Sequence, residues 1–239
     1  MASFSKSQID RLGERLKKGS PSDADLRLLD EYRRSFGPAY DFVIRTIRDR
    51  LQLEPTGRLA KSTSSITEKL RRESIRLSQV QDIAGCRVVV TGIIAQDQTI
   101  AKLRETFPGA KIVDRREHPT HGYRAVHVII ETKEVQVEIQ VRSSLQHLWA
   151  ELSERLSDVV DSTIKYGGGE QQVREHLSLT SGQIGKIEEF EKELNASSGE
   201  RPSEQNSEMQ RFQDIISHMK NEMAEAFHDY IANLEGSKR

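Results

Sequence analysis

The feature that constrains the fold most is the alternation of apolar and polar residues in KEVQVEIQVRSS, residues 133–144. Val135, Val137, Ile139 and Val141 recur at every second position, which is the period of a β-strand with one buried face. The polar residues between them are predicted to face solvent, where simple solvation would accept any polar side chain and an active site would need particular ones. This polar row consists of Glu134, Gln136, Glu138, Gln140 and Arg142.

The segments around this strand predict an α+β fold. Residues 1–53 are expected to form an N-terminal helical segment, with one helix capped by Ser22 and another after a break at Gly37-Pro38. Strands are expected in residues 86–94, 110–118, 123–132 and 133–142, with a tight turn near Thr132-Lys133. Helices are expected in residues 96–107 and 143–160.

The C-terminal part is predicted to be helical. Residues 171–194 have a helical pattern interrupted at Gly182 and Gly185, and residues 195–207 are predicted to be a polar linker. The final segment carries apolar residues at steps of three and four, which is typical of one long amphipathic helix. Such a helix is not stable alone in water, so its stripe must pack on the body of the protein or on a partner chain. The stripe consists of Met209, Phe212, Ile215, Ile216, Met219, Met223, Phe227, Tyr230, Ile231 and Leu234.

The charge balance and the single cysteine exclude several classes of function. Lys plus Arg number 36 and Asp plus Glu 37, so no global field favours nucleic acid or an anionic membrane, and any polyanion site must be local. Cys86 alone cannot form an intramolecular disulfide or a cysteine-based metal cage. The N-terminus lacks the apolar core of a signal peptide and no run approaches a membrane span, which favours a cytoplasmic protein with no membrane partner.

A positive patch is concentrated in GRLAKSTSSITEKLRRESIR, residues 57–76, which has six basic residues against two acidic ones. Ser64 or Ser65 is predicted to cap a helix whose N-terminal N–H groups face the side of Lys61. A helix N-terminus surrounded by lysine, arginine and serine favours phosphate binding, although a solvated basic helix face has the same composition. The basic residues are Arg58, Lys61, Lys69, Arg71, Arg72 and Arg76.

The segment VQDIAGCRVVV places Asp82 before a glycine turn at the entrance of a buried strand. A carboxylate at this position can hold a divalent cation against phosphate oxygens, but it can also cap a turn. Cys86 is predicted to be a small core residue. Arg87 is predicted to be either an ion-pair partner or a cation that faces a ligand.

The segment HPTHGYRAVHVII places Tyr123 and His127 on one face of the predicted strand. These two side chains can stack on a base and reach a polar group, or they can be half-buried packing residues. The spacing of His118, His121 and His127 matches no standard zinc pattern, so a zinc site is not expected.

Together these residues provide the parts of a phosphoryl-transfer site. Glu138 and Gln140 share one face of the last strand and are expected next to the face of Tyr123 and His127, across a hairpin. A basic phosphate cradle, an aspartate suited to Mg2+, an aromatic platform and a glutamate are the groups required for transfer to a hydroxyl. The chain contains no GxxxxGK[ST] sequence, so the site is not a P-loop.

Four ordered motifs resemble the synthetase domain of the RelA/SpoT-type alarmone synthetases. They are GR..K...SI.EKL.R, DIAGCR, GYRAVH, and VEIQVR followed by LWAEL, and they cover about residues 54–166. The resemblance implies a nucleotidyltransferase-like mixed β-sheet flanked by helices, with residues 54–166 as the synthetase core and residues 1–53 and 167–239 as helical segments. With no hydrolase domain before the core and no regulatory half after it, the chain resembles a small stand-alone synthetase.

The resemblance also implies a reaction and a role for each site residue. The β,γ-pyrophosphate of ATP would pass to the 3′-hydroxyl of GTP or GDP, with release of AMP and with Mg2+ as the cofactor. Asp82 and Glu138 would be the catalytic residues and the candidates for metal binding, with Glu138 as the general base. The predicted ATP-binding residues are Arg58, Lys61, Ser65, Lys69 and Arg87. The predicted acceptor-binding residues are Tyr123, His127, Gln140 and Arg142, with Tyr123 stacked on the base.

The sequence departs from the family pattern in two places. Relatives often show R-x-K, whereas this chain has Arg58-Leu59-Ala60-Lys61, so that an extra residue falls between Arg58 and Lys61 while the spacing from Lys61 to Ser65 is kept. The segment after LWAEL also differs from the commoner E-H-x-L-x-Y-K pattern. This second difference bears on the surfaces for regulation and for the homo-oligomer that the resemblance implies.

Two alternative functions share the same residues. Some small relatives act as toxins that pyrophosphorylate the 3′ end of tRNA or make adenine alarmones, in which case tRNA or an antitoxin would be a partner. The other alternative is a non-catalytic nucleotide or RNA binder, although binding alone does not need Asp82 and Glu138 together. The C-terminal helix can complete the core, build an oligomer or cover the ATP site, and the sequence leaves these three possibilities open.

Overall fold

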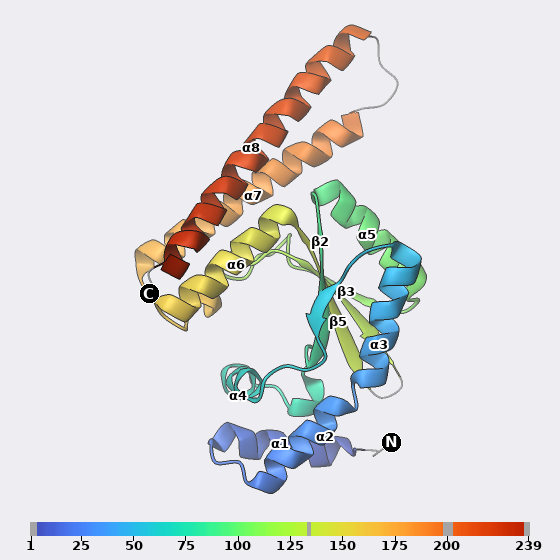
Figure 1. Ribbon diagram of the computed structural model, residues 1–239, viewed down its shortest axis with the longest axis vertical. Coiled ribbons are helices and arrows are strands. Elements are labelled where there is room, and N and C mark those ends of the chain that lie inside the picture. The colour runs from blue at the N-terminus through green and yellow to red at the C-terminus, as the bar shows by residue number, and fades with distance from the viewer. Residues whose placement is uncertain (1–3, 133–134, 198–202, 237–239) are drawn as a thin grey trace. The chain divides into compact units, whose positions relative to one another are not determined.

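The computed structural model describes residues 4–132, 135–197 and 203–236, apart from the side chains of Arg58 and of residues 203–209 (Figure 1). Within these ranges the chain forms an α+β fold whose five-stranded mixed sheet has the strand order β1-β2-β5-β4-β3. This confirms the predicted fold class, a mixed sheet flanked by helices. Lys133, Glu134 and the side chain of Met209, which were predicted to belong to a turn, a strand and a helical stripe, lie outside the described part.

The strands are shorter than predicted, and one was not predicted at all. Ile93 and Ile94 begin helix α5 instead of extending β2, because Thr91 and Gly92 end the strand. The strand β4 begins at Val126, so the expectation that Tyr123 lies on it was wrong. The strands are β1 (Thr56–Arg58), β2 (Ala84–Val90), β3 (Lys111–Asp114), β4 (Val126–Glu131) and β5 (Gln136–Ser143).

The helices of the described part are eight α-helices with three short helical turns between them. The α-helices are α1 (Lys6–Lys18), α2 (Asp23–Arg34), α3 (Gly37–Thr46), α4 (Thr63–Arg72), α5 (Ile93–Thr106), α6 (Ser144–Val159), α7 (Gln171–Ser197) and α8 (Ser203–Gly236). The short turns are a π-helix at Ile47–Leu51 and 3-10 helices at Leu77–Gln79 and Ile164–Tyr166.

Local capping chemistry explains where the first helices begin. Ser22 caps α2, as predicted, because its hydroxyl accepts the N–H of Asp25 while the Asp25 carboxylate accepts the N–H of Ser22. The helix breaks before Gly37-Pro38, as predicted, and these two residues start α3, since proline lacks only an N–H that the first helical turn leaves unbonded. Helix α1 was not predicted, although Ser5 caps its start and Gly19, with a φ of 85°, ends it.

Helix α7 is continuous, so the predicted interruptions at Gly182 and Gly185 were wrong. A Cβ at Gly182 would meet nothing within 4 Å, which means that this glycine is simply tolerated in an exposed turn. Gly185 has a packing reason, because a Cβ there would lie 3.1 Å from the guanidinium of Arg124. The predicted linker at 195–207 is shorter in the structure, since α7 continues to Ser197 and α8 begins at Ser203.

Two compact units make up the chain. The first comprises Met1–Val88, Lys102–Val113 and His127–Gln140, and its core includes Leu12, Leu29 and Ile66 from helices α1, α2 and α4. The second comprises Val89–Ala101, Asp114–Val126 and Val141–Arg239. The predicted division at residues 53 and 166 follows the chain and not these units, and it stays a prediction.

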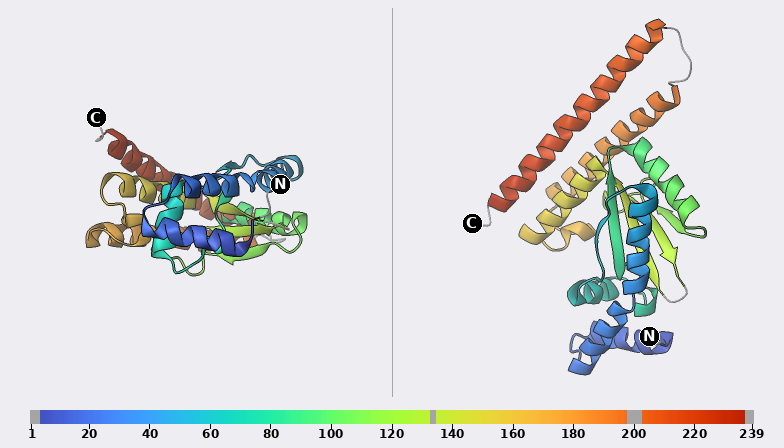
Figure 2. Two further views of the ribbon diagram at one scale, coloured as in Figure 1. Left: turned by 90° about the horizontal axis from the view of Figure 1, so that it is seen from below. Right: turned by 45° about the vertical axis from the view of Figure 1, so that its right-hand side comes forward.

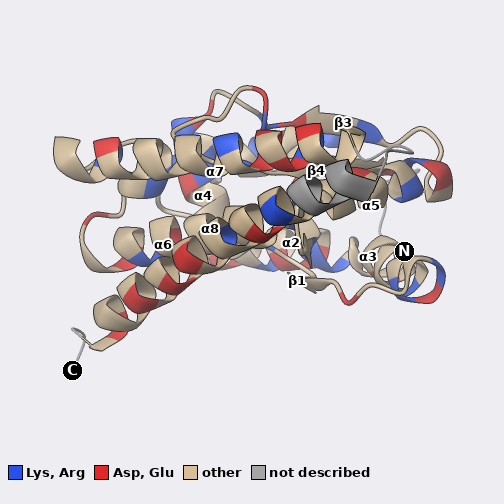
Figure 3. Cartoon of the chain, turned by 90° about the horizontal axis from the view of Figure 1, so that it is seen from above, with Lys and Arg blue, Asp and Glu red and all other residues tan. Residues whose placement is uncertain are grey.

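The core of the second unit lies between helices α6, α7 and α8. Figure 2 shows α7 and α8 side by side and running in opposite directions. Trp149 and Leu152 of α6, Leu177 and Ile184 of α7, and Phe227 of α8 are all buried in this core. Acidic and basic residues alternate along α7, whereas the part of α8 after Lys220 carries acidic residues and no Lys or Arg (Figure 3).

The apolar stripe of α8 packs only in part. Ile216, Met223, Ile231 and Leu234 lie against the core of the second unit, together with the buried Phe227, so this part of the helix packs on the body of its own unit. The other members of the stripe, Phe212, Ile215, Met219 and Tyr230, are exposed. None of the described helices combines the length and the apolar character that crossing a membrane requires.

Candidate active site

A partly buried charge cluster in the first unit joins three of the predicted site residues. Asp82 accepts a hydrogen bond from Lys61 Nζ at 2.6 Å through one carboxylate oxygen and from Lys69 Nζ at 2.8 Å through the other. All three side chains are at most one-fifth exposed. The structure therefore brings the predicted metal ligand and two predicted phosphate ligands into one cluster, which we call the lysine–aspartate cluster.

The lysine–aspartate cluster keeps its carboxylate ionised. Burial raises the pKa of Asp82, but the charges and hydrogen bonds of Lys61 and Lys69 outweigh burial and lower the pKa to about 2. The carboxylate is therefore negative across the physiological pH range. Each ammonium has three N–H donors and the bond to Asp82 uses one of them, so both lysines keep the capacity to bind a further anion.

Two glycines allow the strands beside this cluster to approach closely. A Cβ at Gly57 of β1 would lie 2.5 Å from the carbonyl oxygen of Gly85 on β2. A Cβ at Gly85 would in turn lie 2.9 Å from the carbonyl oxygen of Glu138 on β5. The N–H of Lys61 donates to the carbonyl oxygen of Ile83 at 2.7 Å, which fixes this lysine beside the segment that carries Asp82. The glycines of the GR and DIAGCR motifs thus serve close backbone packing.

Helix α4 begins where the basic patch predicted a helix, but a different serine caps it. Ser62 is the N-cap, and its hydroxyl accepts the N–H of Ser65 at 3.2 Å. The predicted caps Ser64 and Ser65 lie inside the first turn, because the backbone of Ser62 is extended and allows its side chain to reach forward. The N-terminus of α4 follows Lys61 directly, and Lys69 lies in the last turn of the same helix.

The first unit contains a second predicted catalytic carboxylate, that of Glu138. Glu138 is 7% exposed, and its Oε1 lies 2.9 Å from Nδ1 of His127 on β4. Its Oε2 accepts a hydrogen bond from Gln140 Nε2 at 2.9 Å. Burial raises the pKa of Glu138, but the hydrogen bond and the charge of His127 and the hydrogen bond from Gln140 lower it further than burial raises it, so the net pKa is below its ordinary value. Glu138 is therefore an ionised carboxylate in a nearly dry environment.

The polar row of β5 is not a solvated face. Val137, Ile139 and Val141 are buried as the alternation predicted, but Glu138 and Arg142 are buried as well, and Gln136 and Gln140 are half-buried. The expectation of a wet face was wrong because side chains of neighbouring elements cover this row and supply its hydrogen-bond partners. A row of buried polar groups is much more restrictive chemically than a solvated row.

The second unit contains the other two predicted acceptor residues, Tyr123 and Arg142. The guanidinium of Arg142 donates to the Tyr123 hydroxyl at 3.1 Å and lies 5.1 Å from the centre of the tyrosine ring. Arg142 belongs to β5, whereas Tyr123 lies in a turn closed by a bridge between Thr120 and Tyr123. This arrangement, called here the Tyr–Arg pair, combines an aromatic ring with a cation over its face.

Two predicted ATP ligands lie on neighbouring strands of the first unit. Arg58 ends β1 opposite Gly85, and its side chain lies outside the described part. Arg87 lies on β2 opposite Thr56 and is half-buried. Cys86, which directly precedes Arg87 on β2, is buried. Burial together with the nearby charge of Glu138 raises the pKa of its thiol to about 12, as expected of a core residue and not of a nucleophile.

No zinc-type cluster forms among the described residues. Groups of three or more His, Cys, Asp or Glu side chains able to hold a metal ion do not occur there. A cation shared between Asp82 or Glu138 and the phosphates of a substrate needs only one or two carboxylates, so this finding does not bear on it.

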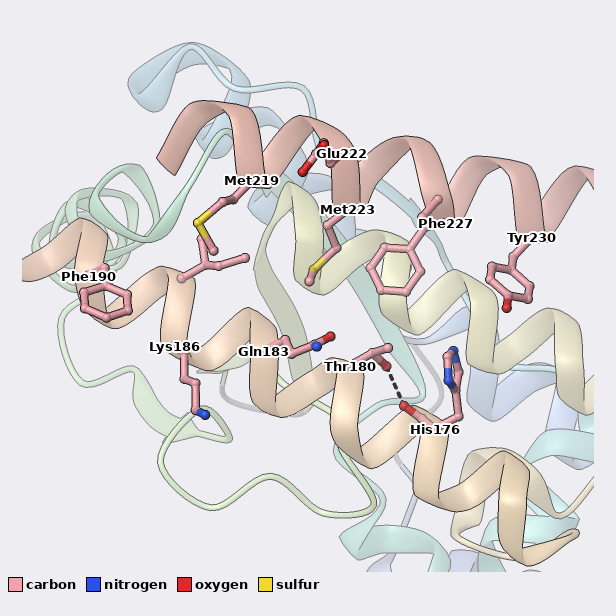
Figure 4. A pocket seen from close by; sticks show the side chains of 12 residues that line it. His176, Thr180, Gln183, Lys186, Phe190, Met219, Glu222, Met223, Phe227 and Tyr230 are labelled. Atoms are coloured by element: carbon pink, nitrogen blue, oxygen red, sulfur yellow. Dashed lines mark hydrogen bonds between the residues drawn. The ribbon is translucent and has the colours of Figure 1, made fainter. Parts of the chain in front are cut away.

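A groove of about 460 Å³ between α7 and α8 contains none of the predicted site residues (Figure 4). Its lining is mostly apolar, with Phe190, Met219 and Phe227 among the side chains that face it. Thr180 and His176 of α7 line the same groove, and the Thr180 hydroxyl donates to the carbonyl oxygen of His176 at 2.9 Å. The groove is therefore a feature of the C-terminal helices and shares no lining residue with the Tyr–Arg pair.

Comparison with known proteins decides the family. A family model described as the region found in RelA / SpoT proteins matches residues 57–157. GTP pyrophosphokinase YjbM of Bacillus subtilis is 30% identical over 155 residues, which are 58% of this chain and 70% of that protein. The chain belongs to the RelA/SpoT family. The resemblance drawn from the four motifs is thereby confirmed.

Other members of the RelA/SpoT family match in sequence and in structure. An uncharacterized protein of Mycobacterium tuberculosis is 38% identical over 118 residues, which are 48% of this chain and 43% of that relative, so the match spans less than half of the relative. The crystal structure of small alarmone synthetase 1 from Bacillus subtilis, bound to its product pppGpp, superposes with a TM-score of 0.54 at 28% identity. That superposition covers 75% of this chain and 100% of the other chain. The fold of this RelA/SpoT family member is thus that of a small alarmone synthetase.

Sequence reasoning missed the contribution of α7 to the surroundings of Tyr123. Ser181 donates to the carbonyl oxygen of Gly122 at 2.6 Å, and Glu188, which is 4% exposed, accepts from Ser143 at 2.7 Å and from Gln146 at 2.8 Å. Burial raises the pKa of Glu188, despite its hydrogen bonds with Ser143 and Gln146 and the charge of Arg124. Gly185 was the visible signal of this packing, but it was interpreted as a break in the helix.

Proposed function

We propose that this chain is an ATP-dependent pyrophosphokinase that transfers the β,γ-pyrophosphate of ATP to the 3′-hydroxyl of GTP or GDP and releases AMP. The observation that carries this proposal is the presence, in one unit, of two ionised carboxylates with different partners, the partly buried Asp82 and the buried Glu138. Asp82 is paired with two lysines, whereas Glu138 is paired with a histidine and an amide. Binding alone does not require both carboxylates, but phosphoryl transfer uses one for the phosphates and their metal and one for the nucleophile.

Lys61 and Lys69 are proposed to bind the phosphates of ATP. Their ammonium groups are oriented by Asp82 before any ligand arrives, so that little side-chain freedom is lost when a phosphate oxygen replaces solvent at the remaining N–H donors. The N-terminal turn of α4, which contains Ser65 and begins directly after Lys61, adds partial positive charge beside this lysine. Arg58 and Arg87 complete the proposed ATP-binding set.

The donor set around Asp82 fits Mg2+ when phosphate is present. One ionised carboxylate oxygen is a hard anionic ligand, and Mg2+ in nucleotide enzymes completes its octahedron with substrate oxygens and waters. Asp82 would hold the ion, with Glu138 as the second candidate ligand, and the ion would neutralise charge on the transferred pyrophosphate. Lys61 and Lys69 then provide the positive charge that the chain itself contributes.

Glu138 is proposed to accept the proton of the 3′-hydroxyl. Its carboxylate is held by His127 and Gln140 in one rotamer, so it is oriented for this transfer without further ordering. Its low pKa keeps it in the base form at neutral pH. In the second unit, Tyr123 is proposed to stack on the base of the acceptor nucleotide and Arg142 to bind its polar groups.

The test uses the full-length chain with ATP labelled at the γ-phosphate, Mg2+, and separately GTP, GDP, ATP and deacylated tRNA as acceptors. We expect label in a guanosine product and release of AMP. Label only in tRNA or in an adenosine product would refute the acceptor assignment, and absence of transfer to every acceptor would refute the enzymatic proposal.

Glu138→Gln separates catalysis from binding in the same assay. We expect transfer to fall by about three orders of magnitude, as for the loss of a base in the transition state, while ATP binding stays within a few-fold. Gln136→Glu, a change on the same strand that places a carboxylate elsewhere, is the matched control for altered charge and should retain activity. Persistence of activity in Glu138→Gln would mean that Glu138 is not the base.

We further propose that the chain forms a homo-oligomer through α8. Phe212 and Ile215 are more than half exposed and lie next to each other on one side of the helix. The exposure of such an apolar pair to water is energetically unfavourable in a monomer. Light scattering after size-exclusion chromatography should give a multiple of 27.2 kDa for the wild type and the monomer mass for the double variant Phe212→Ser, Ile215→Ser. A monomeric wild type would refute this part of the proposal.

A further inference from the structure

Helix α7 contacts three residues that flank the members of the Tyr–Arg pair in the sequence. Tyr123 is flanked by Gly122 and Arg124, and Arg142 is followed by Ser143. Each of these three flanking residues makes a specific contact with α7, as described below. The helix therefore reaches the proposed acceptor-binding residues through the residues that flank them in the chain.

The contacts with the turn before Tyr123 are made by Leu177 and Ser181. The Ser181 hydroxyl donates to the carbonyl oxygen of Gly122 at 2.6 Å. Gly122 has a φ of +86° and a Cβ there would lie 2.6 Å from Cζ2 of Trp149, so no other residue fits between the helix and the indole. The indole N–H of Trp149 donates to the carbonyl oxygen of Leu177 at 2.9 Å. The turn is thus held between α6 and α7.

The contacts with Arg124 are made by Gly185 and Glu188. The guanidinium of Arg124 lies so close to α7 that a Cβ at Gly185 would be 3.1 Å from its carbon and from both terminal nitrogens. Nε of Arg124 lies 3.7 Å from Oε2 of Glu188. An arginine packed on a glycine and facing a buried carboxylate has little freedom to move, which fixes the backbone beside Tyr123.

The contact with β5 is made by Glu188 again. Its Oε1 accepts from the hydroxyl of Ser143 at 2.7 Å and from Gln146 at 2.8 Å. Ser143 is the N-cap of α6 and directly follows Arg142. One carboxylate therefore accepts a hydrogen bond from the residue after Arg142 through one oxygen, while its other oxygen faces the residue after Tyr123 at the longer distance of an ion pair.

We propose that the α7 face, defined as Leu177, Ser181, Gly185 and Glu188, positions the Tyr–Arg pair for the acceptor nucleotide and that Glu188 is its main positioning residue. The proposal rests on the proposed function, since it concerns the acceptor of that reaction. These four residues recur at steps of four and three, so they form one stripe of the helix. The residues that α7 directs toward α8, such as His176, Thr180 and Gln183, belong to another side (Figure 4).

The experiment compares wild type with Glu188→Gln and with a matched pair of glycine variants in the full-length enzyme. Glu188→Gln keeps the size of the side chain and an acceptor for Ser143, but it places no negative charge beside Arg124. Gly185→Ala moves Arg124 by a few tenths of an ångström, whereas Gly182→Ala meets no neighbour and controls for the gain in helix propensity.

We expect Glu188→Gln to raise the KM and the Kd for GDP about tenfold and Gly185→Ala to raise them about threefold, with the KM for ATP within twofold of wild type in both. Gly182→Ala should match wild type in all constants. The Kd is measured without ATP from the fluorescence of Trp149, which is the single tryptophan of the chain and lies against Gly122. A merely structural defect would instead lower the fraction of active enzyme and leave both KM values unchanged.

The two proposals fail in different measurements. A wild type that forms no guanosine product overturns the proposed function, and with it the acceptor assignment used here. A wild type that forms the product while Glu188→Gln has an unchanged GDP affinity overturns the positioning role of α7 alone. Equal rises in the KM for ATP and for GDP would also overturn it, because a positioning residue for the acceptor must discriminate between the two substrates.

Discussion

Replacing Asp82 by asparagine should destabilise the folded chain by an amount that depends on pH. The pKa of Asp82 is lowered from 3.8 to about 2 by Lys61 and Lys69, which corresponds to about 2.5 kcal/mol of folding stability at neutral pH. Asp82→Asn removes this contribution and leaves two lysines, each at most one-fifth exposed, without their counter-charge. We therefore expect a loss of at least about 2 kcal/mol in the free energy of unfolding at pH 7.

The sign of the pH dependence follows from the direction of the shift. A carboxyl group with a lowered pKa in the folded state stabilises the protein fully above its unfolded pKa of 3.8, and this stabilisation is lost as the pH falls toward about 2. The wild type should thus lose about half of the contribution by pH 3, where about 1.3 kcal/mol of it remains. The difference between wild type and Asp82→Asn should shrink accordingly.

The measurement is urea unfolding of both proteins at pH 7, 5, 4 and 3, followed by far-ultraviolet circular dichroism. Asp30→Asn is the matched control, because Asp30 pairs with Arg33 at 3.0 Å but is exposed, and it should change the free energy of unfolding by less than about 0.5 kcal/mol. The reasoning is refuted if Asp82→Asn is as stable as wild type at pH 7, or if the difference between them does not depend on pH.

Three further predictions concern single residues of the first unit. His127→Gln should move the acid limb of the kcat–pH profile to higher pH, because burial then raises the pKa of Glu138 without the opposing effect of the imidazole; an unmoved limb would contradict the pairing. Cys86 should resist a thiol reagent at pH 8 until urea unfolds the chain, since its thiol is buried and has a pKa of about 12; rapid reaction of the folded protein would contradict this. Ser62→Ala should lower the free energy of unfolding by about 1 kcal/mol in thermal or urea unfolding, and no change would mean that the cap of α4 is dispensable.

Which apolar residues are buried could be predicted from the sequence, because apolar residues recur with the period of the strand or helix that carries them. Val137, Ile139 and Val141 are buried as the alternation predicts, and the long apolar stripe of the C-terminus forms one helix. Strand and helix ends were less predictable. The strand β2 stops at Val90 and α5 begins at Ile93, although the apolar run continues through both, since an apolar run has no signal that distinguishes a buried strand from a buried helix.

Glycines were misinterpreted wherever their reason is tertiary. Gly185 lies in the middle of a continuous helix because Arg124, more than sixty positions earlier in the chain, packs on it. Local propensity treats such a glycine as a helix breaker at a cost of about 1 kcal/mol, and the packing partner that offsets this cost cannot be identified from the neighbouring residues. The role of the α7 face was therefore inaccessible to reasoning from motifs, all of which end before α7 begins.

In the candidate site, too, the residue types could be predicted from local motifs, whereas the contacts between them could not. From the motifs, Lys61 and Lys69 were predicted to bind ATP and Asp82 to bind Mg2+, without any contact among the three. Their mutual hydrogen bonds depend on α4 lying beside the segment before β2, which the spacing along the chain does not specify. Chemistry is predictable from residue types, but the electrostatic state of each group depends on contacts that only the fold supplies.

Glu138 illustrates why these contacts matter for the proposed mechanism. On a solvated strand face, its carboxylate would be a flexible and well-hydrated group with no preferred orientation. Burial alone would restrict it but would also raise its pKa and favour the protonated form, which cannot accept a proton from a hydroxyl. The imidazole of His127 and the amide of Gln140 hold the buried carboxylate in its ionised form. The contact of His127 on β4 with Glu138 on β5 therefore makes the carboxylate both oriented and ionised, so a change at His127 should shift the pH dependence of catalysis before it affects folding.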